Sequence, residues 1–344
     1  MNVLKNTSLA VALASTALAA PAAATESGCD AGETVLKFSV VTALEGHPKG
    51  EAAMAYAESI NELLNGRYCI EVYGSSELYP DDDTLFTAML NDEVHFAMPA
   101  FAKIIGMSPK ADIFNLPFLF DGPLHVLEFL QSDVIDEISE EVKDDGFAVL
   151  GYVSNGMRQF SATVPIRMPT DASGLSFRVS SSSPITAAVL DIMGVTPVKL
   201  AFKDVYDRLA DDTVQGQENT WANIQTKQFY TVQAAVTETN HTYIGYPMMT
   251  SLAFLDSLDA ETRAIFINTA KLVTHERNRF AFELGQQRRA DIVDDDGIII
   301  RLSDGEMQAW RDAFSPILNQ FAPSIGTNFV NEAIRINAES DPFN

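Results

Sequence analysis

The longest uninterrupted helical pattern in the sequence places the strongest constraint on the fold. It begins after Asp259, a residue type that commonly caps helices, and apolar side chains then recur at helical spacing over about 35 residues. Gly285 is the one glycine in this segment, and no proline interrupts it. At 1.5 Å per residue the helix is roughly 50 Å long, which exceeds the usual length within a globular domain. We therefore expect one helix that packs against two lobes.

Strand and helix patterns alternate along the rest of the chain. A β-rich segment at 34–41 precedes a helical segment at 51–64 and a second strand at 68–73, and a crossover of this length favours parallel pairing. A single helix is expected over 124–143, with strands following at 147–153 and later at 298–302. The chain has no internal repeat and no Pro-, Gly- or Ser-rich linker. These patterns predict an α/β fold of two lobes joined by several crossings, with the ligand site in the cleft between them.

The first residues have the pattern of a secretory signal peptide. Lys5 is followed by an apolar stretch at 9–20, and Ala22 to Ala24 offer a cleavage site of small residues. Residues 1–24 are therefore expected to be removed on export. Cys29 and Cys69 remain, and in an oxidising compartment an even pair predicts one disulfide, the alternative being two buried free thiols.

The charge of the chain argues against several classes of partner. Its 344 residues include 47 Asp and Glu against 23 Lys and Arg, a net charge of −24. Such a surface repels phosphate backbones and anionic lipid, so we expect no nucleic-acid partner. No stretch after the signal is apolar enough to span a membrane, so no membrane insertion is expected. A few buried cations would still be able to hold a small anion.

Motifs for catalysis, metals and cofactors are not found. The histidines lack metal-binding spacing, and there is no nucleophile elbow, Walker A loop or dinucleotide-binding glycine motif. The aspartate triplets at 81–83 and 294–296 lack the alternating spacing of a calcium loop. We expect no metal, no cofactor and no enzymatic activity.

Three stretches place scarce cations and amides among apolar residues: 154–162, 174–182 and 214–224. Arg178 lies within a strand-like segment, and a half-buried arginine is costly unless paired. Its planar fork suits a ligand carboxylate, but an ion pair with an acid of the protein is an equal alternative. From the residues alone Arg158 is better explained as an exposed or ion-paired side chain, and Trp221 as either core or the wall of a site.

The same stretches carry a family resemblance. The segments LKFSVV and HPKG (36–50), NGRYCIEVYGSSELY (65–79), FNLPFLF (114–120), GLSFRV (174–179), VKLAFKDVYDRL (198–209), VQGQENTWANI (214–224) and TNHTYIGY (239–246) occur in one order. In this order and spacing the chain resembles the DctP-like periplasmic solute-binding proteins of tripartite ATP-independent periplasmic (TRAP) transporters. The resemblance implies a type II periplasmic-binding fold, an α/β fold of two lobes with a long helix across both. The lobes are expected at 25–155 plus 245–284 and at 156–244 plus 285–344.

The resemblance also implies a set of ligand-binding residues. Arg178 holds the position of the arginine that clamps the substrate carboxylate, and Asn219 that of an asparagine that hydrogen-bonds the ligand. Arg158 falls where relatives have a second cationic contact. Lys103, Trp221 and His241 stand at positions that vary with the substrate within the family. A second anchor at Lys103 or His47 would suit a dicarboxylate or a sugar acid. Gln215 and Thr220 depart from the family pattern beside Asn219.

The implied function is capture of a small organic anion in the periplasm and its delivery to the TRAP membrane permease. Three alternatives stay open at this point: an organosulfonate as the ligand, a sensory ligand-binding domain, and an exported α/β enzyme.

Overall fold

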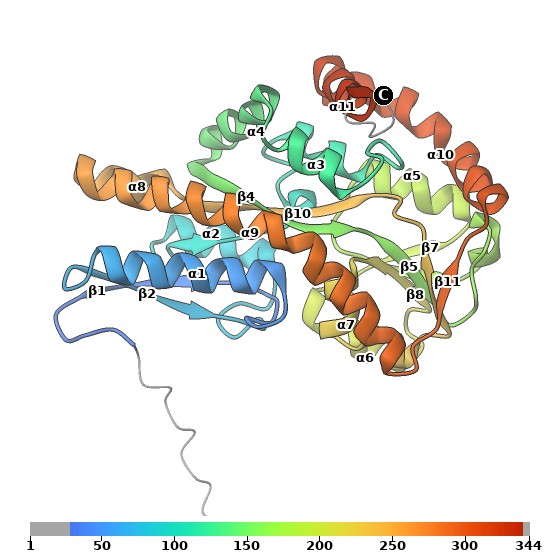
Figure 1. The fold of residues 1–344 in the computed structure, drawn as a ribbon, viewed down its shortest axis with the longest axis horizontal. Helices are drawn as coiled ribbons and strands as arrows, with labels where there is room; N and C mark the ends of the chain where they lie inside the picture. Colours follow the sequence, from blue (N-terminus) through green and yellow to red (C-terminus); the bar gives the residue numbers. More distant parts are fainter. Residues whose placement is uncertain (1–27, 340–344) are drawn as a thin grey trace, which may run out of the picture.

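The computed structural model describes residues 28–339, in which two β-sheets form two lobes joined by long strands and one long helix (Figure 1). The predicted signal peptide, residues 1–24, lies outside the described residues. None of the helices in the described part of the chain combines the length and apolar character of a membrane span.

The sheet of the first lobe has five strands in the order β2-β1-β3-β10-β4. Their bounds are β1 Thr34–Ser39, β2 Tyr68–Tyr73, β3 Phe96–Ala97, β4 Phe147–Met157 and β10 Tyr243–Ser251. β1 runs parallel to β2 and β3, whereas β10 is antiparallel to β3 and β4. Helix α1 (Pro48–Leu63) connects β1 to β2, and α2 (Asp82–Leu90) follows. The predicted strand, helix and parallel strand are therefore confirmed.

The single helix predicted over 124–143 is wrong. The segment contains α3 (Pro123–Phe129), a 3₁₀ turn η3 (Asp133–Ile135), α4 (Asp136–Glu141) and a second turn η4 (Val142–Asp145). The backbone N–H and side-chain hydroxyl of Ser132 both donate to the carbonyl of Phe129, which closes the first helix locally. Leu130 and Ile135, which lie next to the break, are both buried, so apolar residues keep their spacing across it. The sequence pattern therefore did not reveal the break.

The sheet of the second lobe has six strands in the order β11-β9-β5-β8-β6-β7. Their bounds are β5 Gln159–Ala162, β6 Ser176–Val179, β7 Thr196–Lys199, β8 Gly216–Asn219, β9 Ala235–Glu238 and β11 Ile299–Arg301. β6 is parallel to β7 and β8, while β5 is antiparallel to β8 and β9. The strand predicted around Arg178 is β6.

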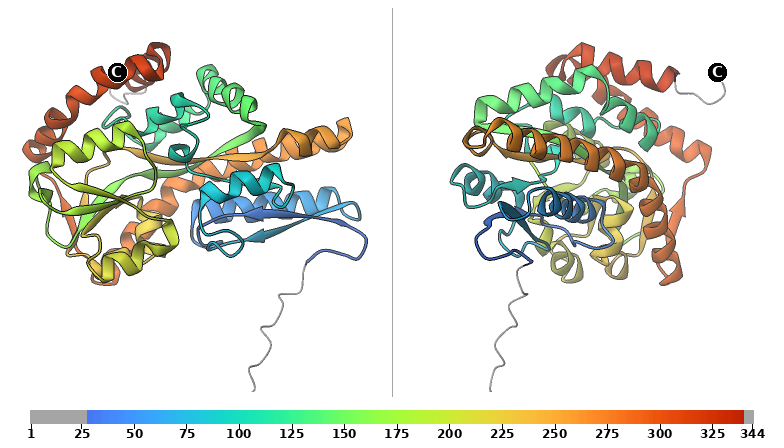
Figure 2. Two further views of the ribbon diagram at one scale, coloured as in Figure 1. Left: turned by 180° about the vertical axis from the view of Figure 1, so that it is seen from behind. Right: turned by 60° about the vertical axis from the view of Figure 1, so that its left-hand side comes forward.

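Two strands and a helix connect the lobes. β4 ends at Met157 in the first sheet, and β5 begins in the second sheet after a single residue, Arg158. β10 pairs with β4 along its whole length. Helix α9 (Ala260–Asp294) has 35 residues and contacts α1, β4 and α7 (Trp221–Thr226), elements of both lobes (Figures 1 and 2). Asp259 caps α9 by accepting from the backbone N–H of Thr262. The long shared helix is thus confirmed.

The remaining helices cover the sheets. They are α5 Pro184–Met193, α6 Val205–Ala210, α8 Leu252–Ser257, α10 Asp304–Ile325 and α11 Thr327–Glu339, with 3₁₀ turns η1 Phe101–Lys103, η2 Pro109–Asn115, η5 Pro169–Ala172, η6 Phe202–Asp204 and η7 Phe229–Val232. α10 packs on both α5 and η2, and α11 packs on α3. The buried indole of Trp310 donates to the carbonyl of Arg167 at 2.8 Å. Helices α10 and α11 therefore contact elements that precede the β4–β5 junction in the sequence as well as one that follows it.

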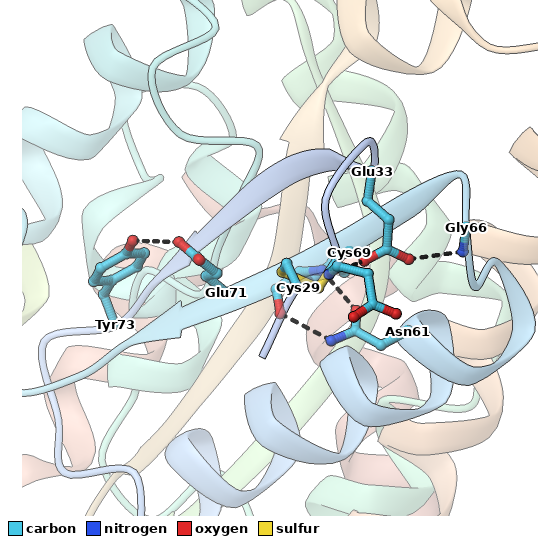
Figure 3. The surroundings of a disulfide bond; sticks show 9 residues. Cys29, Glu33, Asn61, Gly66, Cys69, Glu71 and Tyr73 are labelled. Atoms are coloured by element: carbon cyan, nitrogen blue, oxygen red, sulfur yellow. Dashed lines mark hydrogen bonds between the residues drawn. A yellow bond between two sulfur atoms is a disulfide. The ribbon is translucent and has the colours of Figure 1, made fainter. Parts of the chain in front are cut away.

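The predicted disulfide is present between Cys29 and Cys69 (Figure 3). Cys69 lies in β2, and the adjacent backbone of Ile70 exchanges two hydrogen bonds with the side chain of Asn61 in α1. Glu33 accepts from the N–H of Gly66 at 2.7 Å. The bond ties the segment before β1 to the edge of the first sheet.

Candidate functional site

A cavity of about 60 Å³ lies between the lobes and brings the three polar stretches together. Its first-lobe side is lined by Val41, Thr42, Lys49, Asp81, Asp82, Ala100, Lys103 and Tyr246, and its second-lobe side by Arg158, Arg178, Ser180, Ala201, Phe202, Glu218, Asn219 and Asn223. Ile244, in the strand β10 that connects the lobes, also lines the cavity. About 10–15 Å³ of such space holds one water, so the cavity admits a molecule of only several atoms.

The strand order of the second sheet explains why the three stretches meet. Arg158 lies at the junction of β4 and β5, and β5 pairs with β8 so that Gln159 stands opposite Asn219. β8 is parallel to β6, which carries Arg178. The polar side chains at the ends of these strands therefore reach the same edge of the sheet.

Arg178 is buried without a carboxylate partner in the described part of the chain. Its Nε and Nη2 atoms donate to the carbonyl of Leu200 at 3.2 and 3.1 Å. Burial lowers the pKa of the guanidinium to about 10, an effect that nearby Glu218 opposes, so it remains charged at neutral pH. Of the two alternatives that the sequence left open for Arg178, the ion pair within the protein is not formed.

Arg158, in contrast, forms an ion pair. Its Nη1 donates to Glu218 Oε1 at 2.8 Å, and His241 Nε2 lies 2.6 Å from the other oxygen of the same carboxylate. Burial disfavours the charge of Glu218, but the charge of Arg158 and the hydrogen bond from His241 outweigh it and hold the pKa at about 2. Burial lowers the pKa of His241, whose ring stacks on Phe160 with centroids 4.0 Å apart.

Asn219 belongs to a chain of amide side chains that crosses between the lobes. It donates to Gln217 Oε1 at 2.8 Å and accepts from Asn223. Asn223 Oδ1 in turn lies 2.6 Å from His47 Nε2 of the first lobe. His47 also accepts from the backbone of Lys49 through Nδ1, and burial lowers its pKa to about 3, so the ring is neutral. The network fixes the orientation of the Asn219 amide at the cavity wall.

The first-lobe wall carries two lysines. Lys103 forms an ion pair with Asp83 at 3.0 Å, and Lys199 of the second lobe reaches the same carboxylate at 3.5 Å across the rim. Lys49 lies deeper, with Nζ 4.0 Å from Asp82 and 4.2 Å from the centre of the Tyr246 ring.

The structure thus brings together Arg178, Arg158, Asn219 and Lys103 of the predicted set. Trp221 instead lines a second cavity beside α9, where the guanidinium of Arg289 lies 5.5 Å from its ring. His241 lies behind Glu218 and does not line the cavity between the lobes.

Sequence reasoning missed Lys49, Asp82, Glu218 and Asn223 as cavity residues. One signal for Lys49 was available. It lies in the first turn of α1, where the helix dipole disfavours a cation, so a lysine there is an electrostatic anomaly.

The chemistry of the lining favours anion binding. Among the described residues, the lining contains no histidine or cysteine. The one group of possible metal ligands found in the described part of the chain is Cys29, Glu33 and Cys69, whose two sulfurs are consumed by the disulfide. Guanidinium, ammonium and amide donors from both lobes instead converge on one small space.

Several known proteins have similar sequences. Residues 38–324 match the sequence model of the family described as bacterial extracellular solute-binding protein, family 7. The C4-dicarboxylate-binding periplasmic protein DctP of Vibrio cholerae is 37% identical over 309 residues, which cover 90% of this chain and 92% of that protein. The protein of the same name from Shewanella loihica is 35% identical over 308 residues, or 89% of this chain and 91% of its own.

Solved structures agree with the fold. A TRAP periplasmic solute-binding protein of Shewanella oneidensis with bound succinate has a TM-score of 0.85 at 33% identity, covering 89% of this chain and 99% of its own. One from Pseudomonas aeruginosa with bound L-malate has a TM-score of 0.79 at 32% identity, with coverages of 83% and 99%. The chain therefore belongs to family 7 of the bacterial extracellular solute-binding proteins, the DctP-like solute receptors of TRAP transporters.

Proposed function

We propose that this receptor binds a C4-dicarboxylate in the cavity between its lobes and delivers it to a TRAP membrane permease in the periplasm. The observation that carries the proposal is Arg178, a buried guanidinium on the cavity wall that forms no ion pair with any carboxylate of the described residues. A buried charge of this kind is costly unless a partner compensates it, and a ligand carboxylate fits its bidentate geometry. The ligands of the relatives at 30% identity or more support the same class of anion.

The other predicted residues take supporting roles in this proposal. Asn219 orients the bound carboxylate, because its amide is fixed by Gln217 and Asn223. Arg158 adds a second donor from the same wall, since its Nε has no partner among the described residues. His241 acts through Glu218, and Lys103 contributes positive charge near the rim.

Ligand capture would occur by closure of the lobes. The lobes are connected by β4, β10 and α9, and we propose the division 25–155 plus 245–284 against 156–244 plus 285–344. A ligand that contacts both walls binds the closed arrangement more tightly than the open one, and so shifts the population toward closure. The closed, loaded receptor is then the form that the permease recognises.

A calorimetric panel on the mature protein tests the ligand class. Succinate and L-malate should bind with micromolar or tighter affinity, whereas galactonate and a C4 sulfonate should bind at least about 10-fold more weakly. Tighter binding of the sulfonate or the sugar acid would overturn the dicarboxylate assignment.

The transport role needs a second measurement. Vesicles that contain the permease should take up labelled succinate only when the receptor is added. Uptake that is independent of the receptor would favour the sensory alternative, and chemical conversion of the bound acid would favour the enzyme.

A further inference from the structure

Lys49 is the only lysine among the described residues that is fully buried, with 1% of its side chain exposed. Removing an ammonium group from water is costly unless a close anion compensates it. Burial accordingly lowers the pKa of Lys49. A lysine buried in this way is therefore expected to have a compensating anion close to its ammonium group.

The protein compensates this ammonium only weakly. Its one acidic partner among residues 28–339 is Asp82, whose Oδ1 lies 4.0 Å away, at the outer limit of an ion pair. The same Oδ1 atom has no hydrogen-bond partner among the described residues, although Asp82 is buried. The other lining cations that pair with an acid do so much more closely, at 3.0 Å for Lys103 and 2.8 Å for Arg158. Lys49 can thus form a closer ion pair, and Asp82 Oδ1 can accept a hydrogen bond, inside the cavity.

The position of Lys49 is fixed by the fold. The next residue, Gly50, lies so close to the preceding loop that a Cβ atom would be 2.1 Å from the carbonyl oxygen of Ala43. The backbone N–H of Lys49 donates to His47, and its Nζ lies 4.2 Å from the centre of the Tyr246 ring, a cation–π distance. The ammonium is therefore held at the cavity wall.

Lys49 and Arg178 belong to different lobes and line the same cavity. Each is a buried basic side chain that has no acid of the described residues at close ion-pair distance. A short ligand with an anionic group at each end compensates both, whereas a monocarboxylate compensates one.

We propose that Lys49 binds the second carboxylate of the ligand, so that it determines the specificity for dicarboxylates over monocarboxylates and helps to close the lobes. This inference rests on the proposed function, in which Arg178 binds the first carboxylate. The free oxygen of Asp82 then accepts a hydrogen bond from a ligand hydroxyl or from a water at the same end.

The test compares succinate with butyrate, a four-carbon acid that lacks the second carboxylate. Calorimetry is performed on the wild type, on Lys49→Met, and on the matched control Lys143→Met, an exposed lysine on the surface. In Lys49→Met the affinity for succinate should fall by at least about 30-fold, because one partner of a buried charge pair is lost. Its affinity for butyrate should stay within about 3-fold of the wild type, and Lys143→Met should match the wild type for both acids.

A second variant guards against a folding defect. Lys49→Met leaves Asp82 as an unpaired buried charge, so Lys49→Met/Asp82→Asn, which removes both charges, should show the same selective loss in a stably folded protein. An equal loss for both acids, or an unchanged preference for succinate, would overturn the role of Lys49. Failure of the wild type to bind any dicarboxylate would instead overturn the proposed function, and this inference with it.

Discussion

Arg158 and Arg178 are both buried in the second-lobe wall of one cavity, but their surroundings differ. Arg158 Nη1 donates to Glu218 Oε1 at 2.8 Å, and His241 lies within hydrogen-bond distance of the other oxygen of that carboxylate. Arg178 donates to the carbonyl oxygen of Leu200, and no carboxylate among the described residues lies within ion-pair distance of it. One arginine has its counter-ion within the fold, and the other does not.

The difference teaches how to separate structural from ligand-binding cations in a buried site. Removing one partner of a charge pair formed within the fold leaves the other buried and unpaired, so it lowers stability, whether or not the remaining donors also reach a ligand. A charge without a counter-ion is compensated only when a ligand arrives, so its loss affects affinity. The predictions below test this division of roles.

The largest effect on stability is expected at Glu218. Glu218→Gln leaves the guanidinium of Arg158 buried without an anion, and breaking a buried ion pair in this way costs about 3–5 kcal/mol. Urea denaturation measures the loss of unfolding free energy. The control Glu140→Gln removes an exposed pair with Lys143 and should change little. A cost below about 1 kcal/mol for Glu218→Gln would contradict a structural role for the Arg158 pair.

The same pair predicts a pH dependence of stability. The pKa of Glu218 is about 2 in the folded protein against an ordinary value of 4.5. Between these values the unfolded chain binds more protons, so the contribution is complete above pH 4.5 and is lost as the pH falls toward 2. Its slope reaches about 1.4 kcal/mol per pH unit. Unfolding of Glu218→Gln followed over the same pH range should lack this component, and identical slopes in both proteins would be inconsistent with the pair.

The smallest effect is expected at the rim of the cavity. Lys199 and Asp83 form a pair across the lobes, but their side chains are 55% and 48% exposed. Exposed pairs contribute about 0.2–1 kcal/mol and weaken with salt. Lys199→Ala should therefore lower ligand affinity by no more than about 5-fold in low salt, and the difference should disappear in high salt. A salt-independent loss of 30-fold or more would place a binding role at the rim.

Much of the fold could be predicted because local patterns determine it. The length of α9, its cap at Asp259 and the parallel pairing of β1 with β2 all follow from periodicity and connection length. The break between α3 and α4 could not, because Ser132 ends the first helix while the apolar spacing continues.

The site was predictable only in part, for a related reason. Arg178 is conspicuous as a cation within an apolar strand, which local sequence shows. The pairing of Arg158 with Glu218 joins residues 60 positions apart, and whether a carboxylate lies beside Arg178 is likewise decided by tertiary packing. Lys49 and Asp82 come from different helices that tertiary packing brings to one wall, so no spacing in the sequence relates them.

The most direct test of this account is the calorimetric affinity of Arg178→Ala for succinate, with the exposed Arg208→Ala as its control. Arg178→Ala should lose at least about 100-fold in affinity, which corresponds to about 2.7 kcal/mol, while its urea midpoint stays close to that of the wild type. Arg208→Ala should bind like the wild type. Wild-type affinity in a folded Arg178→Ala variant would contradict the claim that this arginine takes its counter-ion from the ligand.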